Sequence, residues 1–580
     1  MRLLWLFAAC AFIGAAYGDS RTCDAGSLPP FPGLSFDNCV VLQAAGATAG
    51  PALRMAWKIV GDAVQFAMHT DAGLSTLGYV ALGFSYNGGM RGAEMIIASV
   101  DPAGEFVLKS RWSNDYVEPQ PSGAPLQPLG YVSTSNSSMW AFRRPVAAWS
   151  GDESNSIALL RSGGDHLIWA VGSSPGDFDY HGGAGFRGSV RLDLRLGAPA
   201  DTILTGPDVH TLTVTTPTVW TDGTPSRYCW SWHPLPRDRK YHIVQVQALM
   251  QNRMPGLVHH IVSYSCGHDF EHDGSGGDIG ARLRRGEVVC KPDGSMPPVC
   301  PANFIGWASS GVLTYPPEAG FPFGAGEATS ILLEVHYENL AAVKGVPDES
   351  GFNFVYTSRL RPHDLGYLIV GDSLEQQAAM VQPRPQTLPA GHSRYAVTNL
   401  CPASCIANME LKQSELHVVS TTFHMHVKGV AEYIDVYRDG RQRGRLAGTS
   451  HWDFEHQVAI AADGAMQLHP GDSLLTRCIY NTKNRSQLVR PYVFESAPSD
   501  APVVGGFGTY DTAHGHFEEM CYAFLLVWPR VQRSTCIALK NVGFPSLIFC
   551  ERDAQQRYNP SNIMLDASAN ALTGKTALGE

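Results

Sequence analysis

Short apolar segments separated by turn residues fill this chain, and they constrain its fold more than any other feature. Residues 19–195 contain many runs rich in Val, Ile, Leu, Phe and Tyr, and Gly, Pro, Asn or Asp interrupt them. The clearest runs are 55–60, 64–68, 79–84, 94–100, 157–161 and 166–171. Such runs are typical of the strands of a β-sandwich, and long helical periodicity is scarce along the whole chain. The sequence therefore predicts an all-β fold.

Composition divides the chain into several β-rich blocks. Its 580 residues are more than one domain usually holds. A stretch around 196–215 is rich in Pro, Thr and Gly, as linkers between domains are. Further β-rich blocks cover 205–365 and 366–540, and a polar tail covers 541–580. We therefore predict three β domains, 19–195, 205–365 and 366–540, followed by the tail.

The first 18 residues have the pattern of a signal peptide. Arg2 supplies a positive charge, Leu3–Ala16 is apolar, and Ala16-Tyr17-Gly18 is a small-x-small cleavage site. The apolar run is short for a membrane span, which needs about 20 residues. No later stretch is long and apolar enough to cross a bilayer. The sequence therefore predicts a protein that is secreted or that lies in the lumen of the secretory pathway.

Cysteine usage agrees with export. Of 13 cysteines, Cys10 would leave with the signal peptide, and the remaining 12 are an even number. An even number in an exported chain predicts a set of disulfides, and Cys23 and Cys39 are expected to close a local loop. Asn136 and Asn484 begin triplets that accept N-linked glycans.

Charge and composition exclude some classes of partner. The chain is 44% hydrophobic and 17% charged, as globular proteins are, with a net charge of −10. This balance offers no basic face for nucleic acid. The oligomeric state stays open.

A pair of histidines two residues apart is the strongest chemical signal. His424 and His426 stand in a β-like run, so their side chains would point to the same side of a strand. Met520 follows about a hundred residues later, beside Cys521 in an apolar run. Two imidazoles and a thioether suit copper that cycles to Cu(I), and they do not suit zinc or calcium. The alternatives are the polar face of an edge strand and a methionine that only fills a core.

Three other histidines could form a second metal site. His259 and His260 are adjacent, so both could bind one ion only if their strand bends or ends there. His336 lies in the apolar run 331–337. The alternatives are surface histidines for the pair and a buried core histidine at position 336.

Five ordered motifs resemble one family. They are Leu257-Val258-His259-His260, Leu333-Glu334-Val335-His336-Tyr337, Phe423-His424-Met425-His426, His469-Pro470-Gly471-Asp472 and Glu518-Glu519-Met520-Cys521. They resemble the copper type II, ascorbate-dependent monooxygenases, in the branch of dopamine β-hydroxylase and its DBH-like relatives. Residues 19–195 resemble the DOMON domain that precedes the catalytic part in this branch. The resemblance implies a DOMON β-sandwich followed by two jelly-roll-like antiparallel β-sandwich domains.

The same resemblance implies two copper ions per subunit. His259, His260 and His336 would bind the copper that supplies an electron. His424, His426 and Met520 would bind the copper at which O2 reacts with a small-molecule substrate, and ascorbate would be the reductant. The implied disulfides are Cys229–Cys290, Cys266–Cys300, Cys401–Cys536, Cys478–Cys521 and Cys405–Cys550.

The substrate is less constrained. The peptide-hydroxylating branch has an arginine where this chain has Thr422, and without a cation there a peptide carboxylate would not be held. Tyr522, Phe524 and Phe423 could instead form an aromatic wall for an arylalkylamine, or they could be ordinary strand core. We expect hydroxylation of an aliphatic, benzylic-type carbon. The alternative is a non-catalytic copper- or ligand-binding protein of the same fold.

One further hypothesis concerns haem. Met90 and His181 resemble the axial ligand pair of haem-binding DOMON domains, which would make the first domain an electron-transfer module with haem b. The alternative, an exposed loop methionine and a turn histidine, is the interpretation that we favour. A reduced protein without a sharp Soret-region band would exclude the haem.

Overall fold

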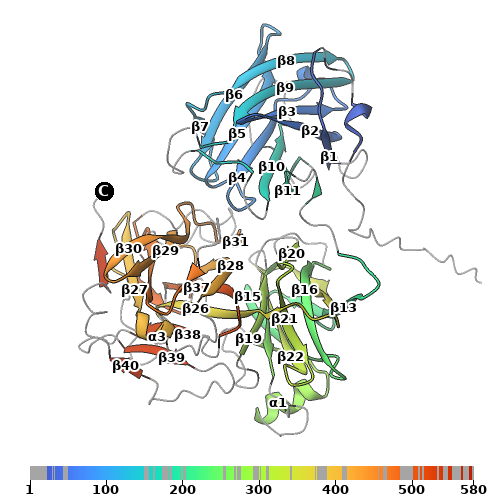
Figure 1. Ribbon diagram of the computed structural model, residues 1–580. Coiled ribbons are helices and arrows are strands. Elements are labelled where there is room, and N and C mark those ends of the chain that lie inside the picture. Colours follow the sequence, from blue (N-terminus) through green and yellow to red (C-terminus); the bar gives the residue numbers. More distant parts are fainter. Residues whose placement is uncertain are drawn as a thin grey trace, which may run out of the picture.

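Three β-sandwiches follow one another along the chain in the computed structural model (Figure 1). The structure describes residues 23–539 and the strand backbones 547–551, 563–565 and 574–577, with gaps at 29–30, 32, 44–49, 149–155, 161–163, 173–180, 182–185, 196–197, 200–203, 252–256, 267–269, 271–275, 292–299, 301, 308–311, 340–341, 373, 375–387, 408–414, 455, 462–466, 484–500, 507–509, 512–514 and 532–534. The predicted signal peptide (1–18), Asn484 and most of the tail 541–580 therefore lie outside the described residues. The all-β prediction is confirmed.

The first unit, called here the N-terminal sandwich, has two sheets packed face to face. One sheet has the order β1-β2-β3-β9-β8: Asn38–Gln43, Leu53–Val60, Ala63–Thr70, Ser137–Pro145 and Gln127–Thr134. The other has the order β12-β11-β10-β4-β5-β6-β7: Ala198–Pro199, Arg187–Asp193, Asp165–Val171, Val80–Ser85, Ala93–Val100, Phe106–Ser113 and Gln120–Pro121. Two short 3-10 turns complete the unit, η1 (Ala25–Ser27) and η2 (Leu74–Thr76). Trp57, Phe66 and Trp140 are among the fully buried side chains of its core.

The middle sandwich is built in the same way. Its first sheet has the order β13-β24-β16-β21-β25: Val209–Thr215, Gly351–Thr357, Lys240–Leu249, Ala319–Gly324 and His363–Asp364, with β20 (Val312–Thr314) paired to β16. Its second sheet has the order β18-β15-β22-β17-β19: Val289–Lys291, Ser226–Pro234, Ser330–Glu338, Val258–Ser265 and Ala302–Trp307. The separate ribbon β14 (Val219–Asp222) and β23 (Lys344–Asp348) and the helix α1 (Gly277–Arg284) complete the unit.

The C-terminal sandwich has the largest sheet. Its order is β31-β28-β37-β26-β38-β39-β40: Ala459–Ala461, Leu416–His424, Cys521–Trp528, Gly366–Asp372, Thr535–Leu539, Leu547–Glu551 and Ile563–Leu565, with β32 (Gln467–Leu468) paired to β28. The facing sheet has the order β30-β29-β33-β27-β41: Arg441–Thr449, Gly429–Arg438, Asp472–Tyr480, Tyr395–Cys401 and Gly574–Ala577. A small sheet, β34-β36-β35 (Val503–Gly505, His516–Glu519, Tyr510–Asp511), and the helix α3 (Ala403–Ala407) complete it.

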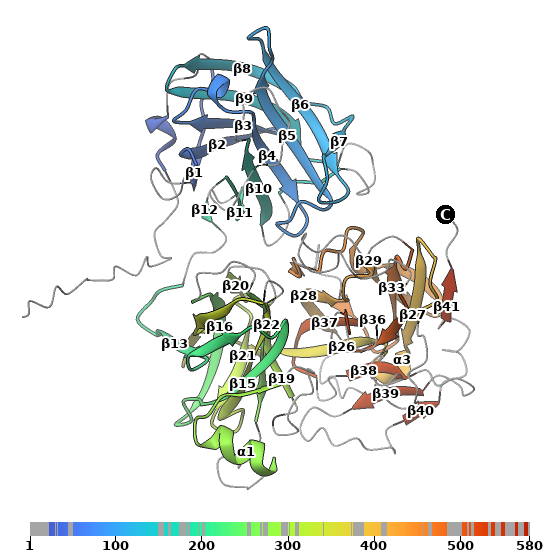
Figure 2. The same cartoon turned by 180° about the vertical axis from the view of Figure 1, so that it is seen from behind.

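The middle and C-terminal sandwiches meet along β37. The side chains of the even-numbered residues Leu526 and Trp528 point away from the C-terminal core and pack with the buried cluster of the middle sandwich. Those of the odd-numbered residues Leu525 and Val527 lie in the C-terminal core. Strands β28 and β37 therefore present one face to their own core and the other face to the middle sandwich (Figure 2).

Disulfides form as predicted at five pairs. They are Cys23–Cys39, Cys229–Cys290, Cys266–Cys300, Cys401–Cys536 and Cys478–Cys521. Cys405 is also disulfide-bonded, and the side chain of its predicted partner, Cys550, is not among those that the structure describes. Within the described residues, no helix has the length and apolar character needed to cross a membrane.

Candidate metal centres

The first group of histidines lies on two neighbouring strands of the middle sandwich. His259 and His260 are on β17 and His336 is on β22, directly opposite His260 in the antiparallel pairing. The register shifts between Val258 and His260, which is a β-bulge, and a bulge re-aims side chains. This is the bend that the adjacent pair requires. One candidate ligand atom from each ring lies within 4.8 Å of the other two.

The ring nitrogens of this group leave room for a shared ion. The Nδ1 atoms of His259 and His260 are 3.1 Å apart, and nitrogens that each lie about 2 Å from one metal ion are about 3 Å apart. Nδ1 of His336 is buried and has no hydrogen-bond partner among the described residues, while its Nε2 lies 3.0 Å from Oγ of Ser226. The three Nδ1 atoms therefore suit a metal ion between them.

Burial keeps the imidazoles of His260 and His336 neutral, which is the form that binds a metal. Desolvation lowers the pKa of His260 and of His336 well below the ordinary value of histidine, and the neighbouring histidines lower both further. The ring of His336 is stacked on Tyr228, with 4.0 Å between the ring centroids. This stacking fixes the plane of the imidazole.

The second group lies at the end of β28 in the C-terminal sandwich. The rings of His424 and His426 have centroids 5.2 Å apart. Nδ1 of His424 lies 2.8 Å from Oε1 of Gln457, and Nδ1 of His426 lies 2.9 Å from the carbonyl oxygen of Glu518. Such contacts fix the orientation of metal-binding imidazoles. They leave both Nε2 atoms for a metal.

Burial also lowers the pKa of both rings in this group. It lowers the pKa of His424 to about 4 and that of His426 to about 3. Both side chains are therefore neutral donors at neutral pH, although the contact with Gln457 and that with Glu518 each oppose part of the shift.

Met520 lies between β36 and β37, beside the second group. The pairing of β28 with β37 sets Tyr522 opposite His424, so an extended chain has Met520 next to His426 on the same face. The carboxylate of Glu519 accepts a hydrogen bond of 2.8 Å from the backbone N–H of His426. The hydroxyl of Tyr480 donates to the carbonyl oxygen of Met520 over 2.7 Å. The backbone that carries Met520 is thus tied to the histidine pair.

The two groups, which lie in different domains, are in contact. The ring centroids of His260 and His424 are 6.5 Å apart. Phe454 lies beside both groups: its ring centroid is 4.2 Å from that of His259 and 5.8 Å from that of His426. Sequence reasoning did not identify Phe454 or Gln457, because no spacing relates them to the histidines.

The face of β28 and β37 that carries His424 also carries aromatic residues. Thr422 is paired with Phe524 and His424 with Tyr522, so all four share one face. Phe423 points the other way and is buried in the C-terminal core. Of the two alternatives for Phe423, the structure supports ordinary strand core over the aromatic wall, because alternation along the strand turns this side chain away from Tyr522 and Phe524.

The candidate haem ligands lie in the N-terminal sandwich. Met90 is half-buried and packs against the cluster of Tyr79, Met95 and Ile97. His181 is half-buried and lies outside any strand. Neither observation tests whether haem binds, so haem stays the less favoured of the two hypotheses for these residues.

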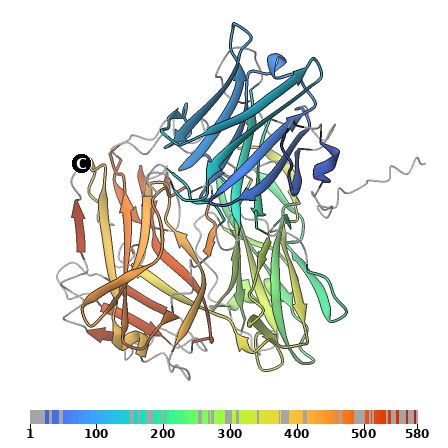
Figure 3. The same ribbon diagram turned by 45° about the horizontal axis from the view of Figure 1, so that its top comes forward.

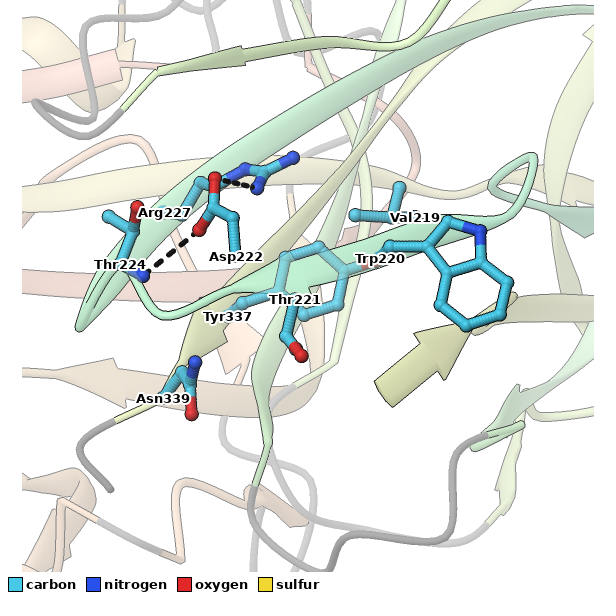
Figure 4. Close-up of a pocket in the computed structure, with 8 residues that line it drawn as sticks. All are labelled: Val219, Trp220, Thr221, Asp222, Thr224, Arg227, Tyr337 and Asn339. Atoms are coloured by element: carbon cyan, nitrogen blue, oxygen red, sulfur yellow. Dashed lines mark hydrogen bonds and ion pairs between the residues drawn. The ribbon is translucent and has the colours of Figure 1, made fainter. Parts of the chain in front are cut away.

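A shallow surface hollow lies elsewhere, at the edge ribbon of the middle sandwich (Figure 4). Asp222 and Arg227 form an ion pair of 2.6 Å at one side, and the exposed Trp220 stands at the other. None of the histidines described above lines it. The hollow is therefore separate from the candidate metal centres.

The donor atoms fit copper. Both groups consist of imidazole nitrogens on buried or half-buried side chains, and the second adds the thioether of Met520, a soft donor that favours Cu(I). No carboxylate joins the three histidines of the first group at metal-binding distance among the described residues. This excludes the oxygen-rich sites that calcium and magnesium prefer.

Comparison with known proteins gives three family matches. Residues 212–344 match the copper type II ascorbate-dependent monooxygenase N-terminal domain, and residues 376–493 match the C-terminal domain of the same family. Residues 50–172 match the DOMON domain. Met520 lies beyond the range matched by the C-terminal model.

Among similar proteins, mouse (Mus musculus) DBH-like monooxygenase protein 1 is 26% identical over 521 residues, which cover 88% of this chain and 76% of that protein. Human dopamine beta-hydroxylase is 24% identical over 475 residues, covering 80% of this chain and 69% of that protein. Among solved structures, the cytochrome domain of Myriococcum thermophilum cellobiose dehydrogenase matches 31% of this chain and 92% of that domain, with 15% identity and a TM-score of 0.25. A likeness of that size is no basis for assigning haem.

Proposed function

Because this chain belongs to the copper type II, ascorbate-dependent monooxygenases and is an enzyme of their dopamine β-hydroxylase-like branch, we propose that it hydroxylates a small arylalkylamine-like substrate. The carbon attacked would be aliphatic and next to the aromatic ring. One atom of O2 would enter the C–H bond and the other would leave as water, with two electrons supplied by ascorbate.

The proposed ligands divide between the two domains. His259, His260 and His336 would hold one copper through their Nδ1 atoms. His424 and His426 would hold the other through Nε2, together with the sulfur of Met520. When bound, the two copper ions supply one electron each and give dioxygen its binding place.

The chain's own residues orient these donors and the substrate. Gln457 and the carbonyl oxygen of Glu518 hold the imidazoles of His424 and His426 with Nε2 outward. Tyr522 and Phe524, whose ring centroids are 6.3 Å apart, would contact the aromatic ring of the substrate from the face that carries His424. Thr422 offers no charge, so a carboxylate has no partner at that position.

The proposed location is the secretory pathway or the extracellular space. Disulfides persist in oxidising compartments, and five of them brace the described residues of this chain.

The single observation that carries the proposal is the contact between the two histidine groups, at 6.5 Å between the rings of His260 and His424. It brings together two sets of imidazole donors from two domains, one for each of the two copper ions that the proposed two-electron oxidation would use. The test is turnover of the copper-loaded full chain with ascorbate against a panel of arylalkylamines, followed by mass analysis of the product. A gain of one oxygen atom with ascorbate-dependent O2 uptake is the expected result.

A glycine-extended peptide serves as the control substrate and should give no product. A chain that binds copper but takes up no O2 with any arylalkylamine would instead favour the non-catalytic copper-binding protein.

A further inference from the structure

The segment 450–457 lies between the N-terminal sandwich, which is the DOMON domain, and both histidine groups. It follows β30 and precedes β31, and its Glu455 is outside the described residues. On the inner side, Phe454 contacts the rings of His259 and His426, and the backbone oxygen of Phe454 lies 3.3 Å from Nε2 of His259. Gln457 contacts Nδ1 of His424. One short segment therefore touches both candidate metal centres.

On the outer side, the same segment is bound to the DOMON domain through Asp453. This carboxylate is 1% exposed. It accepts a hydrogen bond of 2.5 Å from the hydroxyl of Tyr116, and it lies 3.7 Å from Nη1 of the buried Arg91. Nδ1 of His456 is 3.0 Å from the same carboxylate and 3.1 Å from the Tyr116 hydroxyl. We call these four residues the interdomain cluster.

The cluster keeps Asp453 charged. Burial alone would raise the pKa of this carboxyl, but His456, Arg91 and the hydroxyl of Tyr116 together hold it below its ordinary value. A buried carboxylate that loses one such partner is strongly destabilised. His456 of the same segment has the largest of these effects, and the other two partners, Arg91 and Tyr116, come from the DOMON domain, so that domain supplies part of the stabilisation of the charge on Asp453.

Close packing surrounds the cluster. A Cβ atom added at Gly89 would lie 2.7 Å from Nδ1 of His456 and 2.8 Å from the Asp453 carboxylate. The ring of His451 lies against two aromatic residues of the DOMON domain, Tyr86 and Trp112, with centroid distances of 6.2 Å and 5.4 Å. Figure 3 shows the DOMON domain lying across the other two units. The contact is thus built from complementary side chains and has no space for a larger residue at position 89.

Within the segment, few backbone hydrogen bonds hold the chain. The described ones include Trp452 N–H to the oxygen of Val430, 2.9 Å, and His456 N–H to the oxygen of Asp453, 3.1 Å. The indole of Trp452 donates to the oxygen of His426 over 3.0 Å. Because the described residues of 450–458 form no strand ladder, side-chain contacts have to fix where Phe454 and Gln457 lie.

We infer that the DOMON domain positions the two metal centres through this segment: Arg91 and Tyr116 hold Asp453, and Asp453 in turn holds Phe454 and Gln457 against the histidines. Asp453, Arg91 and Tyr116 are positioning residues, since none touches a candidate ligand in the contacts described here. The effect on metal binding rests on the proposed function, whereas the ordering of the segment does not.

The first test measures amide hydrogen exchange in the metal-free full chain. Tyr116→Phe removes one hydrogen bond from the DOMON side and leaves the catalytic domains unaltered. We expect exchange at Trp452 and His456, whose amides are hydrogen-bonded, to become about tenfold faster, and Asp453→Asn should have the larger effect. The matched control is Asp435→Asn, because Asp435 is also 1% exposed and is paired with Arg445 and Arg477 on β30 and β33 of the same sandwich.

The second test measures copper in the same variants. Cu(II) titration followed by electron paramagnetic resonance should show a weaker site with altered nitrogen coupling in Tyr116→Phe and in the wedge variant Gly89→Ala, with affinity lowered roughly tenfold. Asp435→Asn should keep the wild-type spectrum. The wedge variant covers the case in which Asp453→Asn does not fold.

The inference is overturned if exchange at these amides stays at the wild-type rate in Tyr116→Phe and Gly89→Ala, or if Asp435→Asn accelerates it equally. If the wild-type chain binds no copper, the proposed function fails, and the exchange rates still decide whether the DOMON domain orders the segment.

Discussion

The two histidine groups hold their rings in opposite orientations. In the middle sandwich the Nδ1 atoms of His259 and His260 face each other, and the Nε2 atom of His336 is turned outward to Ser226. In the C-terminal sandwich it is the Nδ1 atoms of His424 and His426 that are engaged by the protein. The first group would therefore use the nitrogen nearer to the backbone, and the second would use the nitrogen at the tip of the ring.

This difference suggests two ways of fixing the donor nitrogens. In the first group the backbone sets their positions, and in the second group hydrogen-bond contacts to the rings set them. Nδ1 is one bond from the carbon that joins the ring to the chain, so its position follows from strand pairing and from the bulge at β17. Nε2 lies farther from the backbone and therefore moves farther than Nδ1 when the side chain turns about its Cα–Cβ bond, so its position depends on Gln457 and on the carbonyl oxygen of Glu518. We expect the second site to be the more sensitive to residues that touch no metal.

The largest effect is expected when a donor of the backbone-fixed group is removed. His336→Gln should lower the copper content from two ions to one per chain and reduce hydroxylation to background, because one electron store is lost. Metal analysis with product mass spectrometry measures both quantities. His242→Gln is the matched control, since His242 is also buried in the middle sandwich but pairs with Asp364. Retention of two ions in His336→Gln would refute the assignment of this group.

Met520→Ile should abolish hydroxylation and leave the chain folded, because isoleucine keeps the volume and lacks the sulfur that favours Cu(I). The first site should keep its copper signal. Met425→Leu, a volume-conserving change in the core on the opposite face of β28, should retain turnover. Normal turnover by Met520→Ile would show that the thioether is not a ligand and would make the two sites more alike than we propose.

Parts of both sites could be predicted from the sequence because strand geometry is local. The two-residue spacing of His424 and His426 indicates a shared face, and the adjacency of His259 and His260 requires the bend that the bulge at β17 supplies. The same alternation decides between the two alternatives for Phe423: it stands between Thr422 and His424, so it faces the core. Residue type alone could not make that choice, whereas position in the strand could.

The outer contacts could not be predicted. Gln457 and Phe454 reach the histidines from an irregular segment, where no periodicity relates residue number to direction. The contacts of Asp453 could not be predicted either, since its partners Arg91 and Tyr116 lie in another domain. Such contacts depend on how three sandwiches dock, and no spacing in one sequence encodes that arrangement.

The contacts that orient the histidine rings from outside the proposed ligand sets should contribute differently to copper binding in the two groups. Gln457→Leu removes the contact to Nδ1 of His424 and should lower turnover or copper affinity by about 10–100-fold. Ser226→Ala removes the contact to Nε2 of His336, and because stacking on Tyr228 still holds that ring, we expect a change below about tenfold. Copper titration of each variant measures the two changes in affinity, so that they can be compared. Equal losses in the two variants would contradict the division into a backbone-fixed and a contact-fixed site.

The smallest effect is expected at Thr422, which shares the face of His424. In the proposed function Thr422 lies near the substrate and binds no metal. Thr422→Arg adds a cation that should repel a substrate ammonium group, so KM for an arylalkylamine should rise by roughly threefold to tenfold, on the scale of an exposed charge interaction. The copper content should stay at two, since no donor changes. Raised salt should reduce the effect, because screening weakens repulsion between exposed charges. A KM that is unchanged at low salt would mean that the substrate amine lies away from this face, and the aromatic pair Tyr522 and Phe524 would then have to be assigned to packing between the two domains.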